Sequence, residues 1–265
     1  MLIESTTHLP VGLAWAGDLF HSPTATDIAR ILLRWSHFVF GITWIGLLYF
    51  FNLVNVPFQK GMDADTKKKV NPDLLSRSLW YFRWGAVGTV LVGLAYYAMY
   101  ILSADVTNTN AAGGNANVWV VLIVWLLFPI IVFAIEYMII MKVPALTKDG
   151  RLFAVVVAVL VLIMAYLIIW WLDGQLTTGR DHFASNKTFS IGIGGALGLI
   201  MLLNVWGIIW PLQKRSIAAF AGTGPATPPE FARRAFLASR TNAWLSLPLL
   251  FLMATSHGDW IIFGH

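Results

Sequence analysis

One face of the first long apolar stretch collects residues that could hold a flat cofactor. Arg30, Arg34, His37, Gly41 and Trp44 recur at spacings of three and four, so they share one side of a helix. His37 could be an axial ligand of a haem iron, and Arg30 and Arg34 could pair with its propionate carboxylates. Gly41 would leave room for the macrocycle. The alternative is an ordinary packing face in which His37 bonds a backbone carbonyl.

A second histidine follows the last apolar stretch. Asn242, Met253 and His257 lie close to one face of that predicted helix. Two histidines in the outer halves of different helices suit a haem with two imidazole ligands, and Met253 is the fallback for the second ligand. The alternative is a histidine at the membrane interface, with Trp260 as an anchor. We therefore predict His37 and His257 as ligands of haem iron.

Glu136 is a carboxyl group in the middle of the third apolar stretch. An ionisable side chain is costly in lipid, so each one inside a span is a functional candidate. Glu136 could pass protons, or it could be a neutral acid bonded to a neighbouring helix, and both interpretations stay open. Glu136 and Asn242 are our candidates for contact with a proton or a substrate. The sequence does not identify a catalytic residue.

The composition is that of a membrane protein. Of the 265 residues, 58% are apolar and 12% are charged, against about 45–50% and about 25% in average globular domains. A bilayer can solvate this much apolar surface, and water cannot. Because the sequence has no cysteine, disulfides, iron–sulfur clusters and covalently attached c-type haem are excluded. The formal net charge of +5 comes from short basic loops, so we predict no nucleic-acid partner.

The apolar stretches that must position these residues predict an all-α bundle. A spanning helix needs roughly 20 mostly apolar residues, and about six stretches meet or nearly meet that length. We expect one domain over residues 1–265, with a short interfacial segment at about 10–20. Asp27 is the favoured N-cap of the first helix, Thr24 or Thr26 is the alternative cap, and Pro57 is its end. The spans are predicted at about 27–56, 79–102, 118–143, 152–172, 189–212 and 241–263.

The connections between spans predict the orientation. Fourteen of the 18 Lys and Arg lie in or beside the connections after the first, third and fifth spans. The positive-inside rule places these connections in the cytoplasm, and therefore both termini in the periplasm. Residues 103–117 are rich in Asn, Ala and Gly and are expected to form a flexible loop. Residues 230–239 are expected to form a short surface helix whose basic side chains face lipid headgroups.

Two parts of the chain resemble a known family. Leu33–His37 (LRWSH) and Gly41–Gly46 (GITWIG) resemble the first membrane helix of the bacterial membrane-bound, cytochrome c-linked urate oxidases, or urate hydroxylases. That helix has an Arg-Trp-x-His element followed by Gly-x-x-Trp-Ile-Gly. The closing helix of the family is similar to Ser239–Asn242, Leu245–Pro248, Leu252–Met253 and Ser256–His257.

The resemblance implies oxidation of urate to 5-hydroxyisourate, with electrons passed to a c-type cytochrome domain fused after the membrane region. This sequence departs from that pattern, because it has no Cys-x-x-Cys-His and ends at His265. We therefore expect a membrane redox protein of the bacterial inner membrane that binds haem b and uses a separate periplasmic c-type cytochrome. The alternative function is a cofactor-free structural transmembrane subunit of a larger respiratory or photosynthetic complex, with lipid and other membrane subunits as its partners.

Overall fold

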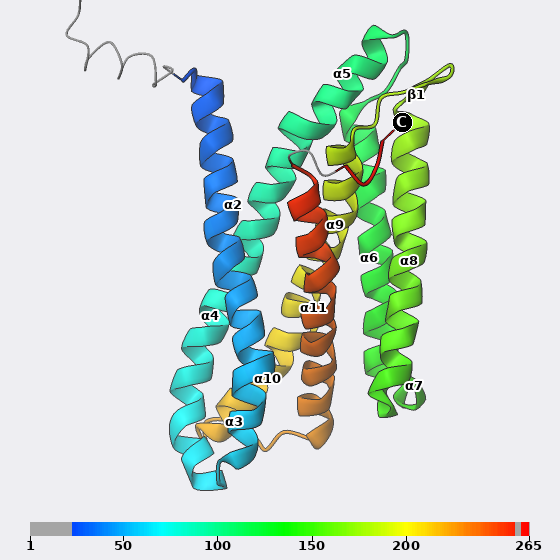
Figure 1. The fold of residues 1–265 in the computed structure, drawn as a ribbon. Helices are drawn as coiled ribbons and strands as arrows, with labels where there is room; N and C mark the ends of the chain where they lie inside the picture. The colour runs from blue at the N-terminus through cyan, green and yellow to red at the C-terminus, as the bar shows by residue number, and fades with distance from the viewer. Residues whose placement is uncertain (1–22, 258–260, 265) are drawn as a thin grey trace, which may run out of the picture.

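The computed structural model describes residues 23–257 and 261–264 as a bundle of long helices (Figure 1). The all-α fold class is confirmed, while the expected interfacial segment at 10–20 lies outside the described residues. In chain order the elements are α2 (Ala25–Tyr49), η1 (Phe50–Asn55), α3 (Val56–Gly61), α4 (Ala64–Tyr96), η2 (Tyr97–Leu102), α5 (Ser103–Ala111), α6 (Val118–Lys142), α7 (Pro144–Lys148), α8 (Gly150–Gln175), β1 (Thr177–Thr178), β2 (Asp181–His182), α9 (Asn186–Asn204), η3 (Val205–Ile209), α10 (Trp210–Phe220) and α11 (Pro229–Thr255).

Five continuous helical stretches of the described chain are long and apolar enough to cross a membrane. They are Ala25–Gly61, Ala64–Ala111, Val118–Lys142, Gly150–Gln175 and Asn186–Phe220. The sixth predicted span belongs to α11, which packs mainly against α9. The first half of α11 carries four charged residues, which lower its mean hydropathy. The start of α2 and the end of α11 lie at the same end of the bundle (Figure 1). The number of crossings and the orientation stay predictions.

The start of α2 corrects the predicted cap. Thr24 is the N-cap: the backbone N–H of Asp27 donates to its hydroxyl oxygen at 3.2 Å, and the backbone N–H of Thr24 donates to the Asp27 carboxylate at 3.1 Å. Asp27 is thus the third residue of a reciprocal capping box and not the cap itself.

The predicted end of the first helix at Pro57 is also wrong, because the helix continues to Gly61. A proline has no N–H, and its ring clashes with the carbonyl four residues earlier. The chain relieves this conflict with the wider π turns of η1, immediately before Pro57. The π segment η3 stands in the same relation to Pro211. The third π segment, η2, has no proline after it, and we have no physical account of it.

Residues 103–117 are more ordered than their composition predicted. Ser103–Ala111 continues the preceding helix as α5, because the hydroxyls of Ser103 and Thr107 bond carbonyls one turn back. The remaining connection is fastened by Asn110, whose side-chain amide makes hydrogen bonds of 2.9 and 2.7 Å with the backbone of Ala116. The polar residues that suggested a loop therefore bond backbone within this segment.

Residues 230–239 are the first part of α11 and not a separate surface helix. Both basic side chains of this stretch bond backbone carbonyls of the protein. Arg233 donates to the carbonyls of Thr147 and Lys148 at 2.9 and 3.3 Å, and Arg234 donates to the carbonyl of Met141 at 3.3 Å. The last carbonyls of a helix lack partners within the helix, and a cation there also interacts favourably with the helix dipole. These arginines therefore bind the ends of α6 and α7.

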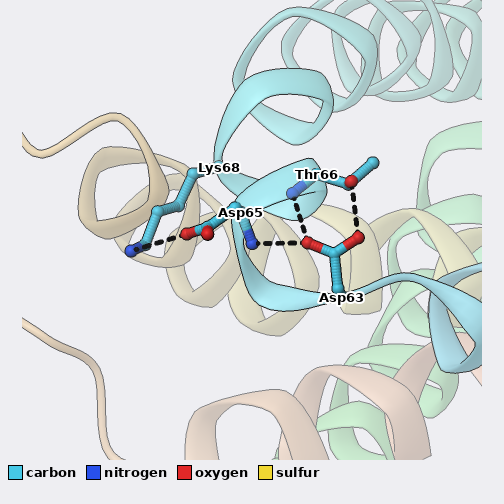
Figure 2. A network of polar contacts seen from close by, with 4 residues as sticks. All are labelled: Asp63, Asp65, Thr66 and Lys68. Atoms are coloured by element: carbon cyan, nitrogen blue, oxygen red, sulfur yellow. Dashed lines mark hydrogen bonds and ion pairs between the residues drawn. The ribbon is translucent and has the colours of Figure 1, made fainter.

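At the same end of the bundle, Asp63 caps α4 (Figure 2). Its carboxylate accepts hydrogen bonds from the hydroxyl of Thr66 at 2.6 Å and from the backbone N–H groups of Asp65 and Thr66 at 2.9 Å each. The pKa of Asp63 is lowered from its usual value by these hydrogen bonds. The Thr66 hydroxyl contributes most, and the backbone N–H groups contribute the rest. Lys68 forms an exposed ion pair with Asp65 at 3.5 Å. The cap stabilises the first turn of α4 in water.

Candidate functional site

A cavity of about 740 Å³ lies between α2 and α11, with α4, α6 and α9 also contributing to its wall. It occupies the half of the bundle that contains the start of α2 and the end of α11. The wall includes every residue that the sequence proposed around a cofactor, except Arg30. These are Arg34, His37, Gly41, Trp44, Met253 and His257.

His37 is held against α4 by one hydrogen bond and one glycine. Its Nδ1 lies 2.9 Å from the carbonyl oxygen of Thr89. A carbonyl can only accept, so Nδ1 carries the proton and Nε2 of the neutral ring keeps its lone pair. A Cβ at Gly93 would lie 2.7 Å from Cε1 of His37, so only glycine accommodates the ring there. The bond to a backbone carbonyl, which was the alternative for His37, therefore exists and leaves Nε2 available.

His257 is oriented in the same way. Its Nδ1 lies 2.6 Å from the hydroxyl oxygen of Ser256, and that hydroxyl donates to the carbonyl of Met253 at 2.7 Å. Because the hydroxyl proton is already used, Nδ1 of His257 is the donor and Nε2 keeps its lone pair. This Nε2 is buried and has no hydrogen-bond partner in the described structure. A buried nitrogen without a partner is uncommon and points to a missing ligand.

The aromatic wall contains one further polar atom without a partner. Trp125 donates its indole N–H to the carbonyl of Gly192 at 2.9 Å. The hydroxyl of Tyr97 donates to the backbone carbonyl of Thr188 at 3.2 Å. Tyr49 bonds the hydroxyl of Ser246 at 3.0 Å. Trp44 is 1% exposed, and its indole N–H has no partner in the described structure. Two residues of the cavity wall, Trp44 and His257, therefore each have a buried ring nitrogen without a partner in the described structure.

The two arginines of α2 separate. Arg34 lies on the cavity wall and is exposed at its outer end. Arg30 is not part of the wall, because its guanidinium lies over the ring of Tyr100, 4.8 Å from the centroid. Of the two predicted partners for an anionic group, only Arg34 is placed to serve the cavity.

The mouth of the cavity is apolar. Three of its lining residues are also exposed on the outside of the bundle: Phe38 (58%), Ile42 (72%) and Leu250 (42%). They lie on the facing sides of α2 and α11, whose upper halves stand apart (Figure 1). The cavity therefore opens sideways, toward the surface that faces lipid in a membrane.

Glu136 and Asn242 lie together but not on the cavity wall. The side-chain NH₂ of Asn204 donates to both carboxylate oxygens of Glu136, at 3.1 and 3.2 Å, and to the amide oxygen of Asn242 at 3.0 Å. Asn242 in turn donates to the carbonyl of Met201 at 2.9 Å. All three side chains are fully buried and join α6, α9 and α11. The structure thus places Glu136 bonded to a neighbouring helix, as one of its two interpretations expected.

The residues that orient the histidines were missed from the sequence. Thr89 acts through its backbone carbonyl, which no side-chain pattern reveals, and Gly93 is one of 22 glycines. Gly194 of α9 allows close packing against α11, because a Cβ there would lie 2.9 Å from Cε of Met253. Among the described residues, no three His, Asp or Glu side chains come together as a metal site.

Comparison with known proteins supports the family suggested by the sequence motifs. A family model described as "Urate oxidase N-terminal" matches residues 59–265, which is most of the chain. The match includes Met253 and His257 but begins after α2, and so does not include His37. No curated protein and no solved structure gives a significant match. The chain belongs to the urate oxidase N-terminal family.

Proposed function

We propose that this protein is a membrane redox protein that holds haem b in the cavity between α2 and α11, with His37 and His257 as the axial ligands. The observation that carries the proposal is the matched state of the two rings. Each imidazole is bonded through Nδ1, both histidines line one cavity, and Nε2 of each is the nitrogen left to bind iron. A hydrogen-bond acceptor on the other ring nitrogen is the usual way to orient a metal-binding histidine.

The donor set fits a haem better than a bare ion. A macrocycle supplies four nitrogen ligands of its own and needs only two from the protein, which is the number of histidines on this wall. Thiolate ligation is excluded because the sequence has no cysteine. The volume of about 740 Å³ lies within the roughly 300–1,000 Å³ of ligand pockets. Met253 lies one turn before His257 on the same wall and is the fallback ligand.

The chain supplies orientation, charge and a dry wall. Thr89 and Ser256 fix the tautomers of the two histidines, and Gly93 fixes the position of one ring. Arg34, at the outer end of the cavity, would pair with a propionate carboxylate. The apolar wall around these groups excludes water and so strengthens their electrostatic interactions. When bound, haem b supplies one-electron exchange.

Family membership supports urate as the substrate to test first. Conversion of urate and water to 5-hydroxyisourate releases two protons and two electrons. A c-type cytochrome takes one electron at a time, so two reduced cytochromes would balance each turnover. The acceptor that we propose is a c-type cytochrome at the end of the bundle nearest the cavity, on the predicted periplasmic side, because these 265 residues contain no cysteine and so carry no c-type haem themselves.

Visible spectra of purified variants test the ligands. We expect a Soret band in the wild type, loss of haem in His37→Ala, and loss or a changed spin state in His257→Ala. His182→Ala is the matched control, since His182 lies in the β1–β2 hairpin and not on the cavity wall. Full haem content with an unaltered spectrum in folded His37→Ala would contradict the assignment. A wild type without haem would favour the structural subunit instead.

A further inference from the structure

Far from the cavity, Arg83 of α4 has no acidic partner. It lies where α4 runs beside η3 and α10, toward the end of the bundle that carries the basic connections (Figure 1). Within the described chain it forms no salt bridge, and its buried Nε has no hydrogen-bond partner. Arg77, two turns earlier on the same helix, instead bonds Asp73 at 2.8 Å. A charge inside an apolar span needs a partner, and the described chain provides none for Arg83.

Two indoles hold the Arg83 guanidinium. Its Cζ lies 3.7 Å from the ring centroid of Trp210 and 5.7 Å from that of Trp206. The indole N–H of Trp206 also bonds the carbonyl of Arg83 at 3.4 Å, and Trp84 contacts Trp206 edge-on. Aromatic rings interact with the face of a guanidinium and leave the N–H groups on its edge free. The stacked group is therefore oriented but not neutralised.

The surroundings are those of a membrane interface. Trp80, Tyr81 and Trp84 are all exposed on the same two turns of α4, and amphipathic aromatic residues gather at the level of lipid headgroups. Lys214 is exposed one turn beyond Trp210 on α10 and forms no ion pair within the described chain. Its neighbour Arg215 turns instead toward Phe231 of α11, with Cζ 5.5 Å from the ring centroid.

We propose that Arg83, held between Trp206 and Trp210, binds the phosphate of an anionic phospholipid, and that Lys214 adds a second positive charge to the headgroup site. The in-plane N–H groups of a guanidinium match phosphate oxygens in a bidentate geometry that a lysine cannot reproduce. Exposed Trp84 lies where the acyl chains would run, and the tryptophan faces prevent the guanidinium from turning away. Basic pockets between spanning helices are known to take such headgroups.

Lipid binding to the detergent-purified full chain tests this site. Native mass spectrometry and thermal unfolding would be recorded with phosphatidylglycerol, with phosphatidylcholine of the same chains, and with inorganic phosphate. We expect phosphatidylglycerol to be retained and to raise the melting temperature, and the other two to do neither. Equal effects of the two lipids would overturn the proposal. The same effect from inorganic phosphate would replace the lipid with a free anion.

Variants locate the binding. Arg83→Gln should weaken retention of phosphatidylglycerol roughly tenfold through loss of charge-assisted hydrogen bonds, and Lys214→Gln roughly fivefold. Arg77→Gln is the matched control on α4, because Arg77 already has Asp73 as its partner, and should change little. If Arg83→Gln does not fold, Arg83→Lys keeps the charge and should still bind less well than wild type. Unchanged retention in folded Arg83 variants would reject the site.

Discussion

Two buried polar regions of this bundle use similar residues in opposite ways. At the junction of Glu136, Asn204 and Asn242, the side chains bond one another across three helices and nothing but protein surrounds them. At the cavity, each histidine forms a hydrogen bond to a neighbouring protein group through Nδ1 and leaves Nε2 free. The difference shows that an ionisable group within a span is not in itself a binding site. The space beside such atoms separates the two uses, because the junction also leaves one buried atom without a partner in the described structure, Oδ1 of Asn204, but does not lie on the cavity wall.

The largest effect is expected at the junction. Asn204→Leu would leave the Glu136 carboxyl and the amide oxygen of Asn242 without their donor. We expect this loss to lower the free energy of unfolding by about 2–4 kcal/mol. The spectrum of the folded fraction should stay that of the wild type, because the junction is not on the cavity wall. Denaturant unfolding with a parallel spectrum measures both, with Thr43→Val, a half-buried position on α2, as the control. A stable Asn204→Leu that had lost its haem would reverse the comparison.

A smaller effect is expected from Gly93→Ala in the cavity. The new Cβ would lie 2.7 Å from Cε1 of His37 and move the ring off its hydrogen bond to Thr89. Loss of an orienting contact of this kind weakens metal binding by roughly tenfold or more. Gly46→Ala is the matched control, because Gly46 also lines the cavity but a Cβ there meets nothing within 4 Å. Haem titration of both variants should separate them, and equal affinities would mean that Gly93 does not position His37.

The smallest effect is expected at Asp63. Its carboxylate accepts hydrogen bonds from N–H and hydroxyl groups in water, so it is an exposed reference for the two buried regions. Its folded pKa lies below the model-compound value of 3.8, so its stabilising effect is fully present above pH 3.8. That effect is lost as the pH falls through the lowered folded pKa. Asp63→Asn keeps a capping oxygen without titrating. The melting temperatures of wild type and Asp63→Asn should therefore converge as the pH falls below 3.8, and parallel curves would show that the cap contributes nothing.

Helical spacing identified residues on each helix but not what faces them. The predicted cofactor residues Arg34, His37, Gly41, Trp44, Met253 and His257 line one cavity because periodicity reports which side chains share a face. Thr89 and Gly93 could not be predicted, since their contribution is a backbone carbonyl and an absent side chain on another helix.

The errors along the chain have the same origin. Pro57 ends a helix by local rules, yet the wider turns of η1 carry the helix past it. Arg233 looked like a headgroup ligand because its partners, the carbonyls of Thr147 and Lys148, are more than eighty residues away in sequence. The junction was not predicted either, because Asn204 donates to Glu136 and Asn242 on two other helices, and helical periodicity does not report such partners.

The position of α2 has a consequence for how the protein is assembled. This helix packs mainly against α4 and meets α11 only slightly, and the cavity occupies the space that would otherwise be their interface. A cofactor bound to His37 and His257 would join the first and last long helices of the chain, so it could bind only after α11 had been made and inserted. Binding to the native state alone stabilises by mass action. The supply of cofactor would then decide how much of the newly made protein survives proteolysis, whatever the catalytic rate of the finished protein.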